Sequence, residues 1–293
     1  MVTGSLVKGL TTAVIPTLSA AEGEGPGVMG GSKRHPTHAG PSLTLGMTLV
    51  LLASTFFSTA SMAADRVLIV TTTLGFRHDS IETAEQVLGD IASRTRWFEP
   101  VYARTDEEAV EALSATALRN VRLVIFANTT GEIAVQSRAA LLDWVARGGA
   151  FIGVHSASDT WHDSPEYIEM LGGEFERHPD QTFASIFVEE GTHPATKDLE
   201  SPHVLFEEIY LFKNFSRDRV NMLLSLRAHP EDGEEGFFPL GWYRDHGRGR
   251  VLYTALGHRE DIWTSDWFQQ HLTGAIAWGL RRDSPLRRRA VHP

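Results

Sequence analysis

Short apolar runs alternate with amphipathic stretches along the chain from residue 66 onward. Four of these runs are too short for helices and are typical of strands buried on both faces, at residues 66–71, 98–103, 121–127 and 151–154. The stretches between them have apolar positions at helical spacing and predict helices at residues 80–95, 106–116 and 134–147. Because strands and helices alternate, the sequence predicts an α/β fold around a parallel, doubly wound sheet.

The pattern changes after residue 164. Later elements are expected at residues 165–171 (helix), 183–188, 204–212 and 220–226 (strands) and 267–280 (helix). Residues 240–256 predict a hairpin whose turn is supplied by Gly247 and Gly249. The C-terminal half is therefore expected to add antiparallel strands to the parallel sheet.

One stretch, Gly148–Trp161, combines helix-ending residues with reactive side chains. Its two leading glycines suit the end of a helix, and the apolar run 151–154 predicts a buried strand. Directly after this strand come His155, Ser156 and Asp159. Ligands of open α/β sheets bind beyond the carboxyl ends of the strands, so the active site is expected here.

A histidine follows each of three predicted strands: His78 follows the first, His155 the fourth and His258 the last. The carboxyl ends of parallel strands share one edge of a sheet, so these side chains are expected to converge. For each histidine taken singly, the alternative is a buried ring that is satisfied by a backbone carbonyl.

The first 64 residues predict an N-terminal extension that ends in a secretory signal peptide. An apolar segment at residues 43–57 follows two basic residues and precedes the small residues 61–64, which is the order of such a signal. We expect cleavage after Ala63 or Ala64, a secreted or periplasmic protein, and no stable membrane span after cleavage. The alternative is an uncleaved anchor, because residues 43–64 are long enough to cross a bilayer.

Net charge and cysteine content narrow the classes of function. The formal net charge is −10, which argues against nucleic-acid binding because that binding relies on Lys and Arg contacts to phosphate. A cluster of basic residues falls in a tail at residues 284–293, after a single expected domain at residues 65–283. The chain has no cysteine, so disulfides, thiolate metal sites and thiolate nucleophiles are excluded.

Seven different short motifs occur one after another between residues 66 and 280. They are Gly75-Phe-Arg-His78, Gly149-Ala-Phe-Ile-Gly-Val-His155-Ser-Ala-Ser-Asp159-Thr, Leu171-Gly-Gly-Glu-Phe-Glu-Arg-His178-Pro, His193-Pro-Ala-Thr, Glu207-Glu-Ile-Tyr210, Gly241-Trp, and Gly249-Arg-Val-Leu-Tyr-Thr-Ala-Leu-Gly-His258. Together they resemble the ThuA-like, or trehalose-utilisation, family. The resemblance implies a flavodoxin-like three-layer sandwich, a variant of the class I glutamine amidotransferase fold.

The resemblance also shows where this chain departs from its superfamily. Amidotransferases of this class carry a nucleophilic cysteine at a sharp turn after a strand, and here His155 occupies that position within Gly153–Ala157. Ser156 is a weaker alternative nucleophile, because it lies one residue beyond the turn and no Gly-x-Ser-x-Gly surrounds it. Glu207 stands where the resemblance implies an aspartate, which leaves its role open.

Two kinds of chemistry fit the residues that follow the strands. His155 belongs to the residue type that transfers protons near neutral pH, and Asp159 is expected to orient it. His78, His258 and Glu208 would complete either a proton-transfer set or a divalent-metal site, for which zinc is the candidate. No helical His-Glu-x-x-His spacing occurs, so the sequence requires no cofactor and leaves the metal an open question.

Four further residues are candidates for substrate binding: Arg77, Trp161, Tyr210 and His178. The aromatic faces of Tyr210 and Trp161 could stack on a sugar ring, and core packing is the alternative for both. Arg77 could fix a hydroxyl or carbonyl, or pair with an acidic neighbour. His178 precedes a proline in a loop, where a structural role is equally open. Glu208 and Tyr210 are expected to share one face of a strand.

The signal segment predicts an exported protein, and the resemblance implies a role in carbohydrate utilisation, with action on trehalose-type disaccharides or their 3-keto glycosides. A partner sugar oxidoreductase would supply the keto group, and the histidine/glutamate set would then support isomerisation or elimination at the glycosidic bond. The main alternative is a non-catalytic sugar-binding or accessory domain. A glycosidase is a third hypothesis, which needs two carboxylates across one cleft, with Asp159 and Glu208 as the motif residues available.

Overall fold

The structure is a computed structural model that describes residues 64–282. The predicted signal segment and the basic tail lie outside the described residues, so both remain predictions. Across the residues described, no helix combines the length and the apolar character that a membrane crossing needs.

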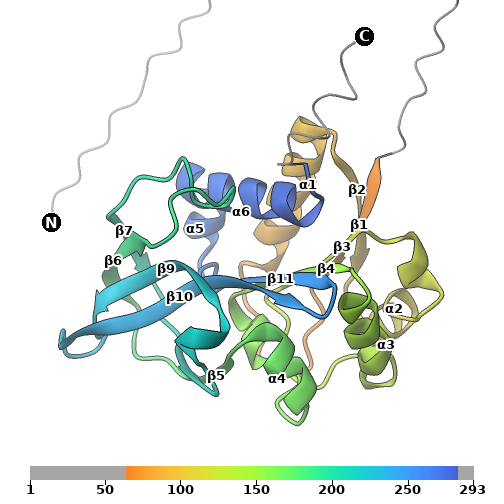
Figure 1. Cartoon of the computed structure of the whole chain (residues 1–293), viewed down its shortest axis with the longest axis horizontal. Coiled ribbons are helices and arrows are strands. Elements are labelled where there is room, and N and C mark those ends of the chain that lie inside the picture. Colours follow the sequence, from red (N-terminus) through yellow and green to blue (C-terminus); the bar gives the residue numbers. More distant parts are fainter. Residues whose placement is uncertain (1–63, 283–293) are drawn as a thin grey trace, which may run out of the picture. The chain divides into compact units, whose positions relative to one another are not determined.

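Parallel strands form one half of a nine-stranded sheet within residues 64–282 (Figure 1). In sheet order they are β2 (Phe98–Ala103), β1 (Asp65–Val70), β3 (Leu123–Ala127), β4 (Ala150–Val154) and β11 (Gly249–Thr254). Every residue of β3 and β4 is buried, as expected for strands covered on both faces. The predicted α/β fold with a parallel sheet is therefore confirmed.

Antiparallel strands continue the same sheet beyond β11. In order they are β10 (Glu235–His246), β9 (Asn221–Ala228), β6 (Thr182–Val188) and β7 (His203–Glu207). A separate two-stranded sheet pairs β5 (Glu174–Arg177) with β8 (Leu211–Lys213). The expected antiparallel addition in the C-terminal half is present, while β5 was not predicted.

Helices lie on both faces of the parallel half of the sheet, which gives this half the three layers of a sandwich (Figure 1). One layer holds α1 (Ile81–Thr95), α5 (Glu260–Thr264) and α6 (Asp266–Gly279). The other holds α2 (Asp106–Ala112), α3 (Val135–Ala146) and α4 (Pro165–Leu171). Short 3-10 turns are η1 (Ala117–Asn120), η2 (His155–Asp159) and η3 (Arg217–Arg219). Helix α5 was not predicted, and the helix predicted at residues 106–116 ends earlier, at the end of α2.

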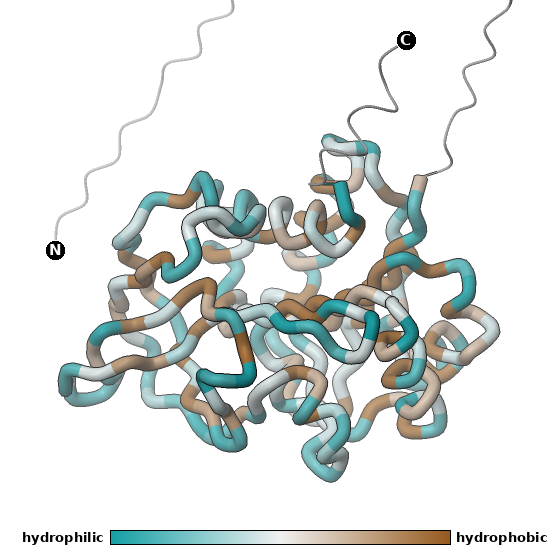
Figure 2. The backbone as a smooth tube through the Cα atoms, in the orientation of Figure 1, coloured by the Kyte–Doolittle hydropathy of each residue, from teal (hydrophilic) through white to brown (hydrophobic). Residues whose placement is uncertain are grey.

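Apolar residues concentrate along the central strands, and polar residues along the outer loops (Figure 2). Trp161 belongs to this core: it is fully buried, and its ring packs 5.4 Å from that of Phe126 and 4.9 Å from that of Tyr167. Its indole N–H donates to the carbonyl of Ile133. Of the two roles considered for Trp161, the structure therefore places it in core packing and not on a sugar.

The strand predicted at residues 204–212 is divided between two sheets. Strand β7 ends one residue before Glu208, and β8 begins one residue after Tyr210. The link between them turns inward, where Ile209 is fully buried, and β8 leaves the large sheet to pair with β5. The expectation that Glu208 and Tyr210 share a strand face is therefore wrong, because both lie in the link.

Two glycines of the β10–β11 hairpin have different tasks. Gly247 has a φ of +60° and forms the turn, as predicted. Gly249 was also expected in the turn, but it is the first residue of β11 and pairs with His246. A Cβ on Gly249 would lie 1.9 Å from the carbonyl oxygen of Val145, so glycine there permits close packing of the hairpin on the end of α3.

The two-stranded sheet is tied to η2 by a charged network around His162. The Nε2 of His162 lies 2.6 Å from Asp159 and its Nδ1 lies 2.6 Å from Glu174. Glu174 is buried and also meets Lys213 at 3.1 Å and Asn214 at 2.6 Å. A ring that donates to two carboxylates must carry both protons. The bond to Asp159, followed by that to Glu174, raises the pKa of His162 to about 9 against the opposing effect of burial.

We predict that His162 stabilises the fold below pH 6.5 and that this contribution is lost as the pH rises towards 9. The folded-state pKa is raised from 6.5 to about 9, so the folded protein holds the proton more tightly than the unfolded chain does. The variant His162→Gln should lower stability by only about 1 kcal/mol at pH 6, because solvent screens the partly exposed ring, and the unfolding midpoint by about 2–4 °C.

Thermal unfolding followed by circular dichroism between pH 6 and 10 would measure this difference. The matched control is His229→Gln, which removes a histidine that meets one exposed carboxylate, that of Asp232 at 3.3 Å. A difference between wild type and His162→Gln that stays constant across this pH range would contradict the prediction.

Candidate active site

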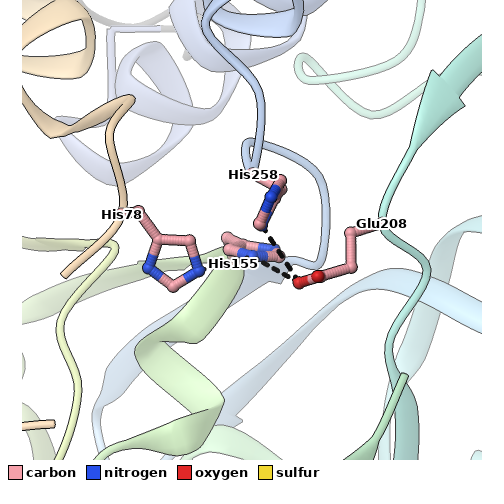
Figure 3. A group of neighbouring side chains, drawn as sticks. All are labelled: His78, His155, Glu208 and His258. Carbon is pink, nitrogen blue, oxygen red and sulfur yellow. Dashed lines mark hydrogen bonds and ion pairs between the residues drawn. The ribbon is translucent and has the colours of Figure 1, made fainter. Parts of the chain in front are cut away.

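Four side chains from separate loops meet at the carboxyl edge of the parallel sheet (Figure 3). His78 follows β1, His155 follows β4, His258 follows β11, and Glu208 follows β7. One potential ligand atom from each lies within 4.8 Å of the others. The predicted convergence of the three strand-end histidines is therefore present in the structure, with Glu208 added to it.

His155 begins η2 directly after β4 and has a left-handed backbone. Its φ is +50°, a conformation that costs a residue with a Cβ about 1–2 kcal/mol. The turn is held by Tyr253, whose hydroxyl donates to the His155 carbonyl at 2.7 Å. The sharp turn after the strand that was expected from the amidotransferase pattern is present, and it projects the imidazole into the cluster.

A backbone carbonyl fixes the tautomer of His155. Its Nδ1 lies 2.8 Å from the carbonyl oxygen of Ala255, and a carbonyl only accepts, so Nδ1 carries the proton. In that tautomer the lone pair is on Nε2, which lies 3.2 Å from Nε2 of His78. Asp159 was expected to orient His155, but its carboxylate binds His162, and the Ala255 carbonyl performs the orientation.

His78 is buried and is the second imidazole with an inward Nε2. Burial, followed by the nearby charges of His155 and His258, lowers the pKa of His78 to about 3, so the ring is neutral at neutral pH. Its Nδ1 lies 3.4 Å from the hydroxyl of Ser156. Ser156 itself is fully buried, so the alternative of a serine nucleophile has no exposed hydroxyl.

Glu208 divides its two oxygens between the cluster and an outer histidine. Its Oε2 lies 3.4 Å from Nε2 of His155 and 3.1 Å from Nδ1 of His258, and its Oε1 lies 3.2 Å from Nδ1 of His178. Burial raises the pKa of Glu208, but the neighbouring His155 and His258 rings outweigh it and hold the pKa well below its usual range. Glu208 is therefore an anion at the centre of the site.

His258 approaches Glu208 without the alignment of a hydrogen bond. Its Nδ1 is buried and has no hydrogen-bond partner among the described residues, although the carboxylate oxygen is 3.1 Å away. Burial lowers the pKa of His258, and the Glu208 carboxylate more than reverses this, so the net pKa is raised. The two groups therefore interact as an ion pair.

Three of the six separations among the four ligand atoms suit a tetrahedral cation site, and all six lie within 4.8 Å. Ligands bound to zinc at about 2.0–2.1 Å in a tetrahedron lie roughly 3.3 Å from one another. The contacts of 3.2 Å (His78–His155), 3.4 Å (His155–Glu208) and 3.1 Å (His258–Glu208) are close to that separation. Three imidazoles and one carboxylate also form a ligand set that zinc accepts.

The other candidate residues surround this cluster in different ways. Tyr210 is buried, and its ring covers that of His155 at 4.2 Å, so it packs against the cluster. His178 is 42% exposed, and its Nδ1 lies 2.9 Å from the Pro179 carbonyl as well as near Glu208. Arg77 is exposed, and its guanidinium reaches the carbonyl of Thr71 at 3.4 Å.

Two shallow cavities open beside the cluster and share Gln181. One, of about 340 Å³, is lined by His258 together with Asp79, Ser80, Gln181, Arg259, Glu260 and Asp261. The other, of about 490 Å³, is lined by His178 together with Pro179, Asp180, Gln181, Thr182, Pro230 and Glu231. His258 and His178, which both contact Glu208, therefore each line a cavity that a polar ligand can enter.

Sequence reasoning missed two features of the site. Phe76 is 65% exposed, and its ring meets His78 edge-on at 4.9 Å. Its position two residues before a strand-end histidine was the available signal, because a large aromatic side chain left in solvent beside a reactive group is unusual. The second feature is the hydrogen bond between His155 and the carbonyl of Ala255. No sequence pattern could have predicted it, because every residue type has a backbone carbonyl.

Comparison with known proteins identifies the family. The family model described as ThuA, trehalose utilisation, matches residues 66–279. No curated protein sequence matches the chain.

Solved structures support the same fold. A ThuA-like protein from Bacteroides uniformis superposes with a TM-score of 0.63 at 19% identity, over 78% of this chain and 97% of that one. A ThuA-like protein from Parabacteroides merdae has a TM-score of 0.63 at 16% identity, over 76% and 92% of the two chains. Part of a β-galactosidase from Bacillus circulans has a TM-score of 0.51 at 14% identity, over 74% of this chain and 31% of that one. Likeness at these identities shows the fold, and the family model, which spans most of the sequence, shows that this chain belongs to the ThuA family of trehalose utilisation.

Proposed function

We propose that this protein is an enzyme that binds one divalent metal ion, zinc by preference, and catalyses proton transfer on a carbohydrate that carries a keto group. The observation that carries the proposal is the convergence of His78, His155, His258 and Glu208 within 4.8 Å at the carboxyl edge of the sheet. The family of the chain supports a carbohydrate as the substrate.

The donor set supports a metal for electrostatic reasons. The Nε2 atoms of His78 and His155 face each other at 3.2 Å, and Nε2 of His155 carries a lone pair because its Nδ1 is the donor to Ala255. Neutral imidazoles with inward lone pairs, beside one carboxylate, attract a cation. When bound, the ion would polarise a substrate carbonyl as a Lewis acid.

His178 is the residue placed to move protons. The neighbours of its Nδ1, a Glu208 oxygen at 3.2 Å and the Pro179 carbonyl at 2.9 Å, both accept, so Nδ1 carries the proton. The other nitrogen, Nε2, is then the basic atom of a ring that is 42% exposed. Glu208 orients this base through Oε1, while its Oε2 faces the three buried histidines.

Elimination from a 3-keto glycoside illustrates the chemistry. A hydrogen on the carbon next to the ketone is acidic, and Nε2 of His178 takes it as a proton. The electron pair left on that carbon forms a double bond to the anomeric carbon, whose bond to the glycosidic oxygen breaks. That oxygen then takes a proton, so charge and atoms balance. A partner oxidoreductase would supply the ketone, and export to the periplasm would place both where disaccharides enter.

We predict that the purified protein binds one divalent ion per chain and that His155→Ala weakens zinc affinity more than about 100-fold, because it removes a ligand directly. Isothermal titration of the metal-stripped protein would measure this. His246→Gln is the matched control, because His246 pairs with Gly249 at the start of β11, on the edge of the sheet opposite to the cluster, and its replacement should keep the affinity. Equal affinity in wild type and His155→Ala would refute the metal site.

We further predict that His178→Gln lowers kcat on 3-keto-trehalose by about 10²–10⁴-fold while it retains the metal, since loss of a general base has that effect. NMR of the sugar over time would follow turnover. Unchanged turnover would remove His178 from the mechanism. If the wild type binds the sugar in calorimetry but never converts it, the protein is a sugar-binding domain and the proposed activity is wrong.

A further inference from the structure

A second glutamate, Glu207, lies directly beside the cluster and has no part in the proposed ligand set. It is the last residue of β7, and its side chain is fully buried. Its Oε1 accepts from the backbone N–H of Gly257 and from that of His258, each at 2.7 Å. The consecutive residues Glu207 and Glu208 therefore both contact His258. Glu207 binds its backbone N–H, and Glu208 pairs with its imidazole.

The turn that Glu207 holds is fixed from its other side as well. Gly257 has a φ of +116°, which favours glycine, and its carbonyl accepts from three donors. They are the hydroxyl of Ser80 at 3.2 Å, the amide of Asn128 at 2.8 Å and the indole of Trp263 at 2.7 Å. All three donors bind the carbonyl of Gly257, whereas Glu207 accepts from the N–H of Gly257 and also from that of His258.

Glu207 has this arrangement at a cost in stability. Its Oε2 has no hydrogen-bond partner, and no side-chain cation pairs with Glu207 among the described residues. A buried polar group that lacks a partner is unfavourable for folding. The side chain therefore contributes to the site through the two backbone bonds of Oε1.

From this geometry we infer that Glu207 is a positioning residue, which holds the His258 backbone so that Nδ1 points into the ligand cluster. This inference rests on the proposed metal site. Residues that orient a metal ligand typically change metal affinity 10- to 100-fold when they are replaced. An aspartate, the residue that the resemblance implies at this position, would be shorter by one carbon–carbon bond, about 1.5 Å, so on this backbone it would not reach the two N–H groups that Glu207 binds at 2.7 Å.

Cobalt binding to the metal-stripped full-length protein tests this inference, with affinity from titration and ligand geometry from the visible spectrum. Glu207→Ala and Glu207→Asp should each lose about 10- to 100-fold in affinity and alter the spectrum. Glu207→Gln should lose clearly less than either, because its amide oxygen can still accept both N–H groups. If Glu207→Ala does not fold, the comparison of Asp with Gln at this position decides the question.

Glu174→Gln is the matched control, because Glu174 is also a buried glutamate but binds His162, Lys213 and Asn214 instead of a ligand backbone. It should lower thermal stability and leave cobalt affinity unchanged. The inference is overturned if Glu207→Ala and Glu207→Asp keep the wild-type affinity and spectrum, or if Glu174→Gln loses as much affinity as they do.

A readout without metal separates this inference from the proposed function. The His258 amide proton should resonate far downfield in the metal-free protein because of its short bond to a carboxylate, and it should move upfield in Glu207→Ala. If wild type binds no cobalt, the proposed function fails and the inferred role in metal binding fails with it. If wild type binds cobalt and the amide resonance does not move, only the positioning role is wrong.

Discussion

The parallel pairing of β4 with β11 is the constraint on which the site depends. Its register sets Val154 opposite Thr254, so the next residues, His155 and Ala255, leave the sheet side by side. The hydrogen bond between them follows from that register, and it fixes both the tautomer and the direction of the His155 ring. Because β1 runs parallel in the same sheet, His78 reaches the same edge. Strand pairing thus determines which side chains and carbonyls meet at this edge of the sheet.

Burial and charge act together at this edge. His78 and His155 are both shielded from water, and burial lowers the pKa of His78, so that its ring stays neutral and can offer a lone pair. Glu208 is the opposite case, because the histidines around it keep it ionised in spite of burial. Contacts of this kind would destabilise an apolar core, but they suit the binding of a cation.

Much of this arrangement could be read from the sequence, and the exceptions share a cause. Strand ends and their histidines were predictable because apolar runs mark strands and parallel strands align their ends. The break after Glu207 was not, since the run at 204–212 has no residue that forbids a strand, and tertiary pairing with β5 decides it. The partner of Asp159 and the burial of Trp161 likewise depend on residues distant in sequence.

Tyr210 limits the side from which a ligand can reach the cluster. Its ring covers one face of His155, whose side chain is completely buried, whereas His258 and His178 retain exposure at 19% and 42%. Access to the cluster is therefore from the side of those two histidines. Under the proposed function, a sugar that entered from this side would present one face of its ring to Nε2 of His178, and the proton would be taken from that face. Tyr210, although it would touch no substrate in this arrangement, closes the opposite approach to His155.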